Sequence, residues 1–359
     1  MSLKVGIVGL PNVGKSTLFN ALLKKQVATA ANYPFTTIEP NVGIVEVPDE
    51  RLEKLKEVVE KSEGLSPSFK IVPAVVEFVD IAGIVKGANK GEGLGNKFLS
   101  HIREVDAIVF VVRDFKNKEI IDTGEDPKSD LEILKSELLL KDLETVEKRV
   151  DMLERELKPL SPGDPKHGLL DLVKRMKTLI EQGEWVGDEF TDEELEKTGD
   201  LQLLSSKKTL VVVNSDEGNL NEEPPIGGAI RICAKLEEEL GGLEPDEQEE
   251  YLGELGIKEP GLNVLIKKAY DVLDLETYLT AGPKEVRAWT IKKGSLAPVA
   301  AGVIHTDFER GFIAADVVSF ADFVQLGGWK GAREKGKVRT IGKAEVVAEG
   351  MVVEFKFSV

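Results

Sequence analysis

The sequence has little cysteine, little histidine and no long apolar run, and each shortage excludes a class of protein. Cys233 is the only cysteine among 359 residues, so no disulfide can form within the chain. With three histidines beside it, a zinc site built from Cys and His is not expected. No apolar stretch reaches the roughly 18 residues of a membrane-spanning helix, and no signal-peptide pattern is present. We expect a cytoplasmic protein without membrane association.

Positive charge is also scarce, because 47 Lys and Arg face 64 Asp and Glu, a formal charge of −17. The balance is uneven: residues 275–359 hold 12 Lys and Arg against 10 Asp and Glu, so the remainder carries −19. An acidic surface repels nucleic acid. We therefore expect no DNA binding and place any RNA contact in the C-terminal part. The length suffices for roughly two to three domains.

The most informative motif is Gly-Leu-Pro-Asn-Val-Gly-Lys-Ser at residues 9–16, which lies between an apolar run at 4–8 and a helix-like stretch at 17–23. This order is typical of a phosphate-binding P-loop. Its glycines let backbone N–H groups converge on phosphate oxygens, Lys15 places a cation at the β- and γ-phosphates, and Ser16 can bind Mg²⁺. The predicted nucleotide contacts here are those of Asn12, Val13, Gly14, Lys15, Ser16 and Thr17.

Short runs rich in Val and Ile alternate with helical segments through most of the chain, at residues 5–8, 76–79, 107–112, 210–213 and 230–233. Near-continuous apolar strands separated by helices indicate a parallel sheet covered on both faces. We predict a doubly wound α/β nucleotide-binding domain, with its chemistry at the carboxyl ends of the strands.

Between the third and fourth of these runs lies a helical pattern of another kind. Leu139, Leu143, Val146, Val150, Leu153 and Leu157 follow heptad spacing. A Pro- and Gly-containing break at 160–165 precedes a second helical pattern that ends at Gly183. This predicts an antiparallel coiled-coil hairpin that projects from the nucleotide domain; two helices packed on the main sheet are the alternative. Thr191 and Glu194 predict a capping box.

After residue 275 the pattern changes to short β-like runs with glycine and proline between them, at 286–291, 299–305, 312–318, 343–347 and 351–357. A small α+β domain on a mixed sheet is the interpretation. The predicted plan has the nucleotide-binding domain at 1–127 and 199–274, the helical insertion at 128–198 and the C-terminal domain at 275–359.

Two further segments resemble the switches of G proteins. Thr37, in a loop-like stretch, can close on Mg²⁺ and the γ-phosphate. The apolar run at 76–79 ends in Asp80-Ile-Ala-Gly83, which brings an aspartate near Mg²⁺ and a glycine N–H to the γ-phosphate. We predict Ser16, Thr37 and Asp80 as the metal-site residues, and Lys15, Gly83 and Asn12 as catalytic.

Base selection is expected in the loop after residues 210–213, where GTPases carry Asn-Lys-x-Asp and this chain has Asn214-Ser215-Asp216-Glu217. Glu217 is one methylene longer than the aspartate that pairs with guanine, so we predict loss of strict guanine selection; a surface turn indifferent to the base is the alternative. Asn214, Ser215 and Glu217, with Cys233 and Ala234, form the predicted base site. Ile84 stands where Ras-type enzymes place a water-orienting glutamine.

These motifs together resemble the Obg-like ATPase (YchF) family of translation-factor-class P-loop NTPases. The resemblance spans nearly the whole chain and includes, beside the P-loop, the segments at 32–41, 80–88, 91–96, 259–263, 284–291 and 305–308, and Asn214 with Glu217. It implies a C-terminal TGS domain of ubiquitin-like β-grasp fold, a preference for ATP over GTP, and a hydrophobic residue, here Ile84, in place of the glutamine.

The resemblance also bears on catalysis. Some relatives use a potassium ion held by a P-loop asparagine, and Asn12 occupies that position, so potassium stimulation is a hypothesis alongside Mg²⁺. Several members carry a proposed catalytic histidine where this chain has Phe110. His101 is the nearest alternative, although a surface or packing role suits it better, and His305 has no partner cluster that would suggest a metal or a triad.

The basic stretch comprising Lys330, Arg333, Lys335, Lys337, Arg339 and Lys343 is the best candidate for a polyanion contact, with a solvated charged loop as the alternative. We predict salt-sensitive binding of the ribosome or its RNA through this face and the hairpin. The favoured function is a slow ATPase switch on the translation machinery; the alternatives are an Obg-type GTPase and a non-catalytic, nucleotide-dependent ribosome-binding module.

Overall fold

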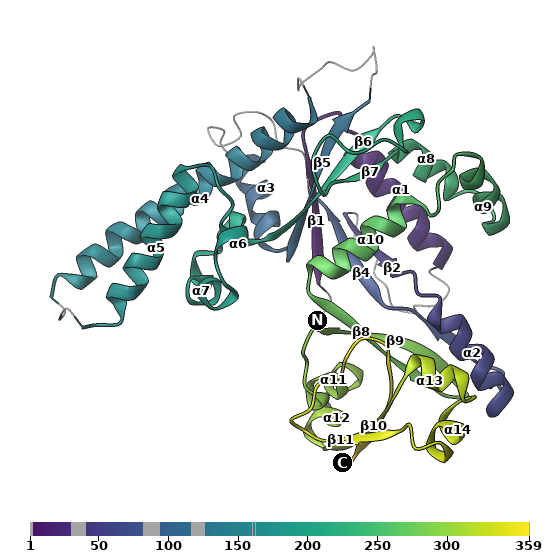
Figure 1. Ribbon diagram of the computed structural model, residues 1–359. Helices are drawn as coiled ribbons and strands as arrows, with labels where there is room; N and C mark the ends of the chain where they lie inside the picture. The colour runs from purple at the N-terminus through teal and green to yellow at the C-terminus, as the bar shows by residue number, and fades with distance from the viewer. Residues whose placement is uncertain are drawn as a thin grey trace.

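The computed structural model describes residues 3–29, 41–81, 94–115, 126–159, 161 and 163–358. Two six-stranded sheets organise these residues, one in the upper body of the molecule and one in the lower, and a pair of long helices projects to the side (Figure 1). Within the described residues, no helix combines the length and the apolar character that crossing a membrane requires.

The first sheet has the strand order β2-β4-β1-β5-β6-β7. All its neighbours pair in parallel except β2, which is antiparallel to β4. β1 and β5 are buried along nearly their whole length, as the predicted two-sided cover requires. The bounds are β1 (Lys4–Gly9), β2 (Val42–Glu46), β4 (Val75–Asp80), β5 (Ala107–Asp114), β6 (Lys208–Ser215) and β7 (Ile230–Ile232).

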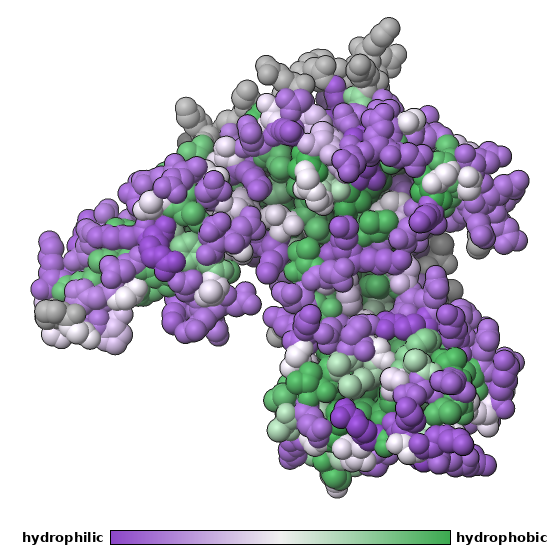
Figure 2. Space-filling model, in the orientation of Figure 1, coloured by the Kyte–Doolittle hydropathy of each residue, from purple (hydrophilic) through white to green (hydrophobic). Residues whose placement is uncertain are grey.

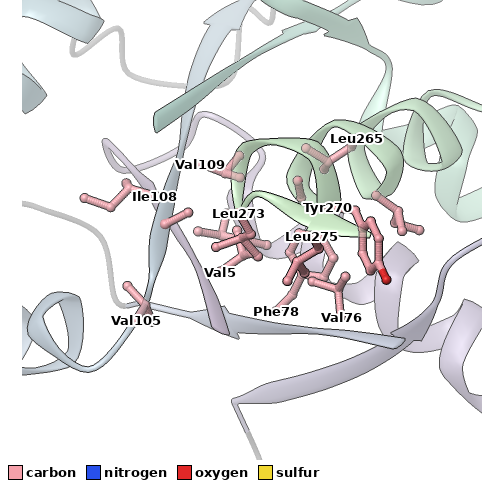
Figure 3. Packing of buried hydrophobic residues seen from close by; sticks show 14 of the residues in the cluster. Val5, Val76, Phe78, Val105, Ile108, Val109, Leu265, Tyr270, Leu273 and Leu275 are labelled. Atoms are coloured by element: carbon pink, nitrogen blue, oxygen red, sulfur yellow. The ribbon is translucent and has the colours of Figure 1, made fainter. Parts of the chain in front are cut away.

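Helices cover both faces of this sheet. On one face α10 brings Leu265 and Tyr270 against Val5 and Phe78, and the same cluster reaches Leu275, where the chain enters the second sheet (Figure 3). Each such fully buried side chain contributes about 1.5–3 kcal/mol. The helices in this part of the chain, not all of which lie on the sheet, are α1 (Lys15–Thr29), α2 (Arg51–Ser62), α3 (Leu94–Arg103), α8 (Ala234–Leu240), α9 (Pro245–Glu254) and α10 (Gly261–Val272).

The projecting pair consists of α4 (Pro127–Leu157) and α5 (Lys166–Glu181), which pack against each other and extend away from the sheet (Figure 1). The predicted hairpin is therefore confirmed over the alternative of two helices lying on the sheet. Five of the six heptad residues are buried, and Leu143 is partly buried. Asp126 begins α4 by accepting hydrogen bonds from the N–H groups of Lys128 and Ser129.

Asp142 fixes the base of this hairpin. Its buried carboxylate accepts hydrogen bonds from the N–H groups of Leu204 and Ser205 and from the Ser205 hydroxyl, at 2.6–2.9 Å. Burial raises the pKa of Asp142. The chain between hairpin and β6 forms α6 (Val186–Glu189), α7 (Asp192–Lys197) and the 3₁₀ helices η3 (Gly199–Leu201) and η4 (Leu204–Ser206); the predicted capping box of Thr191 and Glu194 is confirmed at α7.

The second sheet has the order β11-β10-β12-β8-β9-β3 and mixes parallel and antiparallel pairs. One strand, β3, comes from the first quarter of the chain and pairs with β9 in parallel. The bounds are β3 (Lys70–Val72), β8 (Leu275–Ala281), β9 (Glu285–Lys292), β10 (Phe312–Ser319), β11 (Arg339–Ile341) and β12 (Met351–Phe357), with α11 (Ala297–Ile304), α12 (Thr306–Arg310), α13 (Phe320–Gln325) and α14 (Trp329–Glu334).

Two of the predicted C-terminal strands were wrong. Residues 299–305 fall largely in α11, because Ala297, Ala300 and Ala301 recur at helical spacing and are fully buried, and a proline occupies the first turn. Residues 343–347 contain one isolated bridge, from Val346 to Leu296, and no strand. The other three runs coincide with β9, β10 and β12.

The segment between β2 and β4 joins the two sheets. It contains α2 and β3, and α2 packs against β8, β9 and α13 of the C-terminal part. Arg51, at the start of α2, contacts the Asp49 carboxylate and reaches Glu349 at 2.5 Å. Glu349 also accepts the N–H of Thr277 in β8. The C-terminal sheet is thus held to the nucleotide domain by a strand, a helix and an ion-paired arginine.

Candidate nucleotide-binding site

The P-loop connects β1 to α1, and two of its residues have backbone conformations that few residues adopt. Asn12 and Gly14 both have positive φ, 65° and 87°. A Cβ at Gly14 would collide with the side-chain amide of Asn214, so only glycine fits there. The loop ends at the N-terminus of the 15-residue α1, whose free N–H groups and dipole favour a bound phosphate.

Lys15 and Asp80 meet at the floor of this loop. The Lys15 ammonium contacts the Asp80 carboxylate at the end of β4, and the lysine is 9% exposed. Parallel pairing of β1 and β4 brings the two residues to the same edge of the sheet. A phosphate that replaces Asp80 as the partner of Lys15 would leave the carboxylate available to a hydrated metal ion.

Asn214 ties the P-loop to the side of the cleft where the base is predicted to bind. Its Nδ2 donates to the carbonyl of Val13 and its Oδ1 accepts from the N–H of Ala234, both at 2.9 Å. Val13 is 2% exposed, so it contributes its backbone and not its side chain. The buried amide of Asn214 therefore fixes the P-loop relative to the loop between β7 and α8.

The loop after β6 divides into a buried and an exposed half. Ser215 is buried and accepts a hydrogen bond from Arg231, which also pairs with Asp114 at 2.6 Å. Asp216 and Glu217 are exposed. Glu217 begins the 3₁₀ helix η5 (Glu217–Asn219) and accepts a hydrogen bond from the Tyr251 hydroxyl at 3.4 Å.

Cys233 and Ala234 form the opposite wall, where β7 ends and α8 begins. Burial raises the pKa of the Cys233 thiol, so the thiol stays neutral near pH 7 and presents an uncharged surface. A base that enters between this wall and residues 214–217 meets the uncharged thiol, while Lys235, Glu238 and Glu239 of α8 bring charge to the same side of the cleft.

An open cleft of about 1290 Å³ joins these parts. Of the predicted site residues, it is lined by Asn12, Gly14, Lys15, Ser16, Thr17, Asp80, Asn214, Ser215, Glu217, Cys233 and Ala234. Sequence reasoning missed Leu10, Pro11, Phe115, Asp216, Gly218, Lys235, Leu236, Glu238 and Glu239. Leu10, Pro11 and Asp216 are neighbours of predicted residues, but nothing local to Phe115 pointed to the site.

The chain is similar to known proteins over its whole length. A ribosome-binding ATPase YchF of Bacillus subtilis (strain 168) is 49% identical, with all of both chains covered. The chain belongs to the YchF family. The family's counterpart in Escherichia coli O157:H7, with the same name, is 45% identical, again over all of both chains.

Structure and family models agree with this membership. The solved structure of the Schizosaccharomyces pombe YchF GTPase is 36% identical, covers 99% of this chain and 98% of its own, and has a TM-score of 0.85. The model of the YchF-GTPase C-terminal domain, described as a protein of unknown function, matches residues 275–358. The 50S ribosome-binding GTPase model matches residues 4–148. The relatives' names include both ATPase and GTPase.

The motif at residues 259–263, one of those that carry the family resemblance, does not line the cleft but contacts two helices that begin there. The N–H of Gly261 donates to buried Glu237 at 2.6 Å, and Asn263 accepts from Lys25 near the end of α1. Burial raises the pKa of Glu237 and lowers that of Lys25. These contacts tie α8 and α1, which begin on either side of the nucleotide cleft, to the start of α10.

The other residues considered for catalysis or metal binding fall into three groups. Thr37, Gly83 and Ile84 lie outside the described residues. Phe110 is fully buried in β5, edge-on to Trp185, so its side chain cannot reach a nucleotide. His101 is exposed on α3, and His305 is an exposed cap of α12 whose Nδ1 accepts from the N–H of Asp307. Neither histidine lines the cleft.

The donor set at the phosphate end suits magnesium. Among the described residues, no cluster of three or more His, Cys, Asp or Glu side chains could hold a metal ion by itself. Mg²⁺ is usually bound by one or two protein oxygens, with water and phosphate completing its coordination. Ser16 and Asp80, which line the cleft together with Lys15, provide such a sparse set of oxygens.

Proposed function

We propose that this chain binds ATP in preference to GTP, hydrolyses it slowly, and uses the nucleotide state to control an association with the ribosome. The proposal rests on the cleft in which Asn214 hydrogen-bonds both to the P-loop and to the start of α8. The loop that begins at Asn214 lacks the lysine and the aspartate that GTPases carry at its second and fourth positions. Relatives named ribosome-binding ATPase support the same assignment.

In the proposed reaction, water attacks the γ-phosphorus and ADP leaves. Lys15 and the N–H groups at the start of α1 bind the phosphates and balance the charge that moves toward the leaving oxygen. Ser16 and Thr37 would hold Mg²⁺, and Asp80 would accept hydrogen bonds from its water. When bound, the metal supplies Lewis-acid charge at the β- and γ-phosphates. The Gly83 N–H is assigned to the γ-phosphate.

Slow turnover is expected because neither Phe110 nor Ile84 can orient the attacking water. Phe110 is sealed in the core, and Ile84 has no group that can orient water. Asn12 is exposed, has positive φ and lines the cleft, so we assign its side-chain oxygen to a monovalent cation beside the phosphates. We propose potassium as a stimulating cation, which equal turnover in sodium and potassium buffers would exclude.

The ribosome contact is assigned to the basic stretch of the C-terminal domain. Arg333 pairs with Asp316 and Glu354, and Lys337 pairs with Asp322. Lys330, Lys335, Arg339 and Lys343 are exposed and form no ion pair with any residue that the structure describes. Four exposed cations within 14 residues, without an ion-pair partner among the described residues, suit a phosphate backbone.

The hairpin contributes differently. Residues 128–198 carry 12 Lys and Arg against 19 Asp and Glu, and the exposed hairpin surface is mostly hydrophilic (Figure 2). A net charge of −7 opposes contact with RNA, so a hairpin contact with the ribosome would be made with protein. The basic stretch and the hairpin therefore suit different components of one large partner.

Calorimetric titration of nucleotide-free protein with ATP and with GTP, in buffer with potassium and magnesium, tests the nucleotide assignment. Tighter ATP binding is expected, because adenine does not present the N1–H and N2–H₂ donors that guanine would leave unpaired here. Tighter GTP binding would overturn the preference and place the chain with ordinary GTPases.

Co-sedimentation with ribosomes tests the assigned surface. The double variant Lys335→Glu and Arg339→Glu reverses two unpaired cations and is expected to weaken binding at least tenfold at low salt. The matched control, Lys258→Glu and Lys268→Glu, makes the same charge change at exposed sites of the nucleotide domain. Equal losses in the two variants would show a general charge effect and remove the C-terminal assignment.

A further inference from the structure

A small apolar cluster, separate from the main core, supports the base side of the cleft. It contains Cys233, Leu236 and Leu240 around α8 and Leu252 from α9, with Leu220, Tyr251, Leu255 and Ile257 packed against it. α9 therefore does not pack on the sheet. Its apolar side is used to hold α8 and the loop that follows β6.

Two hydrogen bonds fasten α9 to that loop. Asn221 Nδ2 donates to the carbonyl of Leu255 at 2.9 Å, and the Tyr251 hydroxyl donates to Glu217 Oε1 at 3.4 Å. One bond is made by Glu217, the first residue of η5, and the other by Asn221, two residues after this turn ends. The turn that carries the base-selecting position is thus held at both ends by α9.

The partner of Glu217 lies outside the cleft. Glu217 lines the cleft, whereas Tyr251 does not. A hydrogen bond to Tyr251 therefore draws one carboxylate oxygen of Glu217 toward α9 and away from the base. The Glu217 charge is the first cause of a raised pKa for Tyr251, so the hydroxyl keeps its proton and remains a donor at neutral pH.

We propose that Tyr251 is a specificity-determining residue, whose hydroxyl holds the Glu217 carboxylate toward α9 and so withholds it from the N1–H and N2–H₂ donors of guanine. The inference rests on the proposed ATP preference and assigns a cause to it. Selection against GTP then depends on the contact between Tyr251 and Glu217 as well as on the length of the Glu217 side chain. Adenine has no such donor pair, so ATP loses no hydrogen bond when the Glu217 carboxylate is held toward α9.

The variant Tyr251→Phe tests this while the ring stays in the apolar cluster. Released from its partner, Glu217 can turn toward guanine and accept a charge-assisted hydrogen bond. We expect the Kd for GTP to fall about tenfold in calorimetric titration with magnesium and potassium. The Kd for ATP should change less than about twofold. The control Glu250→Gln, at an exposed position on the same helix, should change neither Kd.

Two further variants connect the effect to Glu217. Adding Glu217→Gln to Tyr251→Phe should cancel the gain in GTP affinity, because the charged acceptor is gone. Glu217→Ala alone should leave GTP affinity near that of the wild type, since the carboxylate is already withheld. A large loss of GTP affinity in Glu217→Ala would show that Glu217 contacts guanine in the wild type and would overturn the inference, even where Tyr251→Phe fails to fold.

The wild-type titrations separate the two ways to fail. Tighter binding of GTP than ATP by the wild type overturns the proposed function, and the inference with it. An ATP preference that Tyr251→Phe leaves unchanged overturns the inference alone, and the proposed function stands.

Discussion

The two six-stranded sheets of this protein share a strand number and little else. In the first, five strands run in parallel and their carboxyl ends deliver Lys15, Asp80 and Asn214 to one edge. In the second, the strand directions are mixed, so the strand ends do not meet at one edge, and none of its strands lines the nucleotide cleft. A parallel sheet concentrates chemistry where its strands end. The mixed sheet instead offers surfaces, among them the basic stretch.

The tryptophans allow each sheet to be followed separately. Trp185 packs edge-on against Phe110 of β5, whereas Trp289 and Trp329 lie in the C-terminal domain. In a Trp185→Phe protein, the fluorescence of Trp289 and Trp329 follows unfolding of the second sheet. In a protein with Trp289→Phe and Trp329→Phe, the fluorescence of Trp185 follows unfolding of the first. The predictions below use these two reporters.

The largest expected effect separates activity from stability. Lys15→Ala should lower nucleotide hydrolysis on the order of 10² to 10³-fold, because we propose the Lys15 ammonium as the main cation of the phosphate site. Both tryptophan reporters should keep their unfolding midpoints. Phosphate release under steady state measures the first effect, and Lys24→Ala, further along α1, is the control. A variant that keeps a tenth of wild-type turnover would contradict the role of Lys15.

A large loss of stability is expected at the base of the hairpin. Asp142→Ala leaves two buried N–H groups and the Ser205 hydroxyl without an acceptor, so the free energy of unfolding should fall by about 3 kcal/mol. Denaturant unfolding followed by Trp185 measures it. Asp151→Ala, at an exposed position of the same helix, should cost less than about 0.5 kcal/mol. Equal effects would mean that Asp142 does not anchor the hairpin.

A smaller change is expected where the sheets join. Arg51→Ala removes the contacts with Asp49 and Glu349 and should destabilise the second sheet by about 1 kcal/mol, since both pairs are partly exposed. The midpoint reported by Trp289 and Trp329 should then fall below that of Trp185. Arg155→Ala, exposed on α4, is the control. Coincident midpoints in Arg51→Ala would show that β3 and α2 suffice to couple the sheets.

The smallest effect concerns pH and has opposite signs in the two regions. Although burial acts to raise it, hydrogen bonds from Lys356 and Thr340 hold the pKa of Asp316 below its ordinary value. The unfolded state then binds a proton first, so this stabilisation is present above the unfolded pKa of about 3.9 and is lost as pH falls through the folded pKa.

Asp142 behaves in the reverse sense, because burial raises its pKa and the folded state takes up the proton first. Its ionisation opposes folding as pH rises through the raised pKa, and acidification relieves that cost. Between pH 5 and pH 2 the Trp289 and Trp329 signal should therefore lose stability more steeply than the Trp185 signal. Asp316→Asn should flatten the steeper curve, and an unchanged slope would contradict the assignment.

The sequence predicted best those parts whose structure is determined by neighbouring residues, and least well those that depend on contacts with distant segments. The P-loop is eight consecutive residues, and the hairpin is a heptad repeat, so both were recognised without knowledge of the fold. The residues 299–305 misled because Val and Ile suggest strands, while the burial of three alanines at helical spacing made a helix. Strand β3, of three residues, has no pattern of its own and exists only because β9 pairs with it.

The site shows the same division. Asn214 was found by its motif, but its second contact, to Ala234, depends on the parallel pairing of β6 and β7. Tyr251 and Phe115 came from segments whose distance from the cleft the sequence does not specify. Thr37 and Gly83 stay predictions, since they lie outside the described residues.

The pairing of β3 with β9 sets an order for synthesis. Lys70 pairs with Glu285, which the ribosome adds 215 residues later. At about 5–20 residues per second, that interval lasts roughly 10 to 40 s. During it the nascent chain can complete the parallel sheet, but β3 and the face of α2 that covers the second sheet have no partner. The C-terminal domain is therefore finished last, and a chain truncated before residue 285 would present an open strand edge to its neighbours.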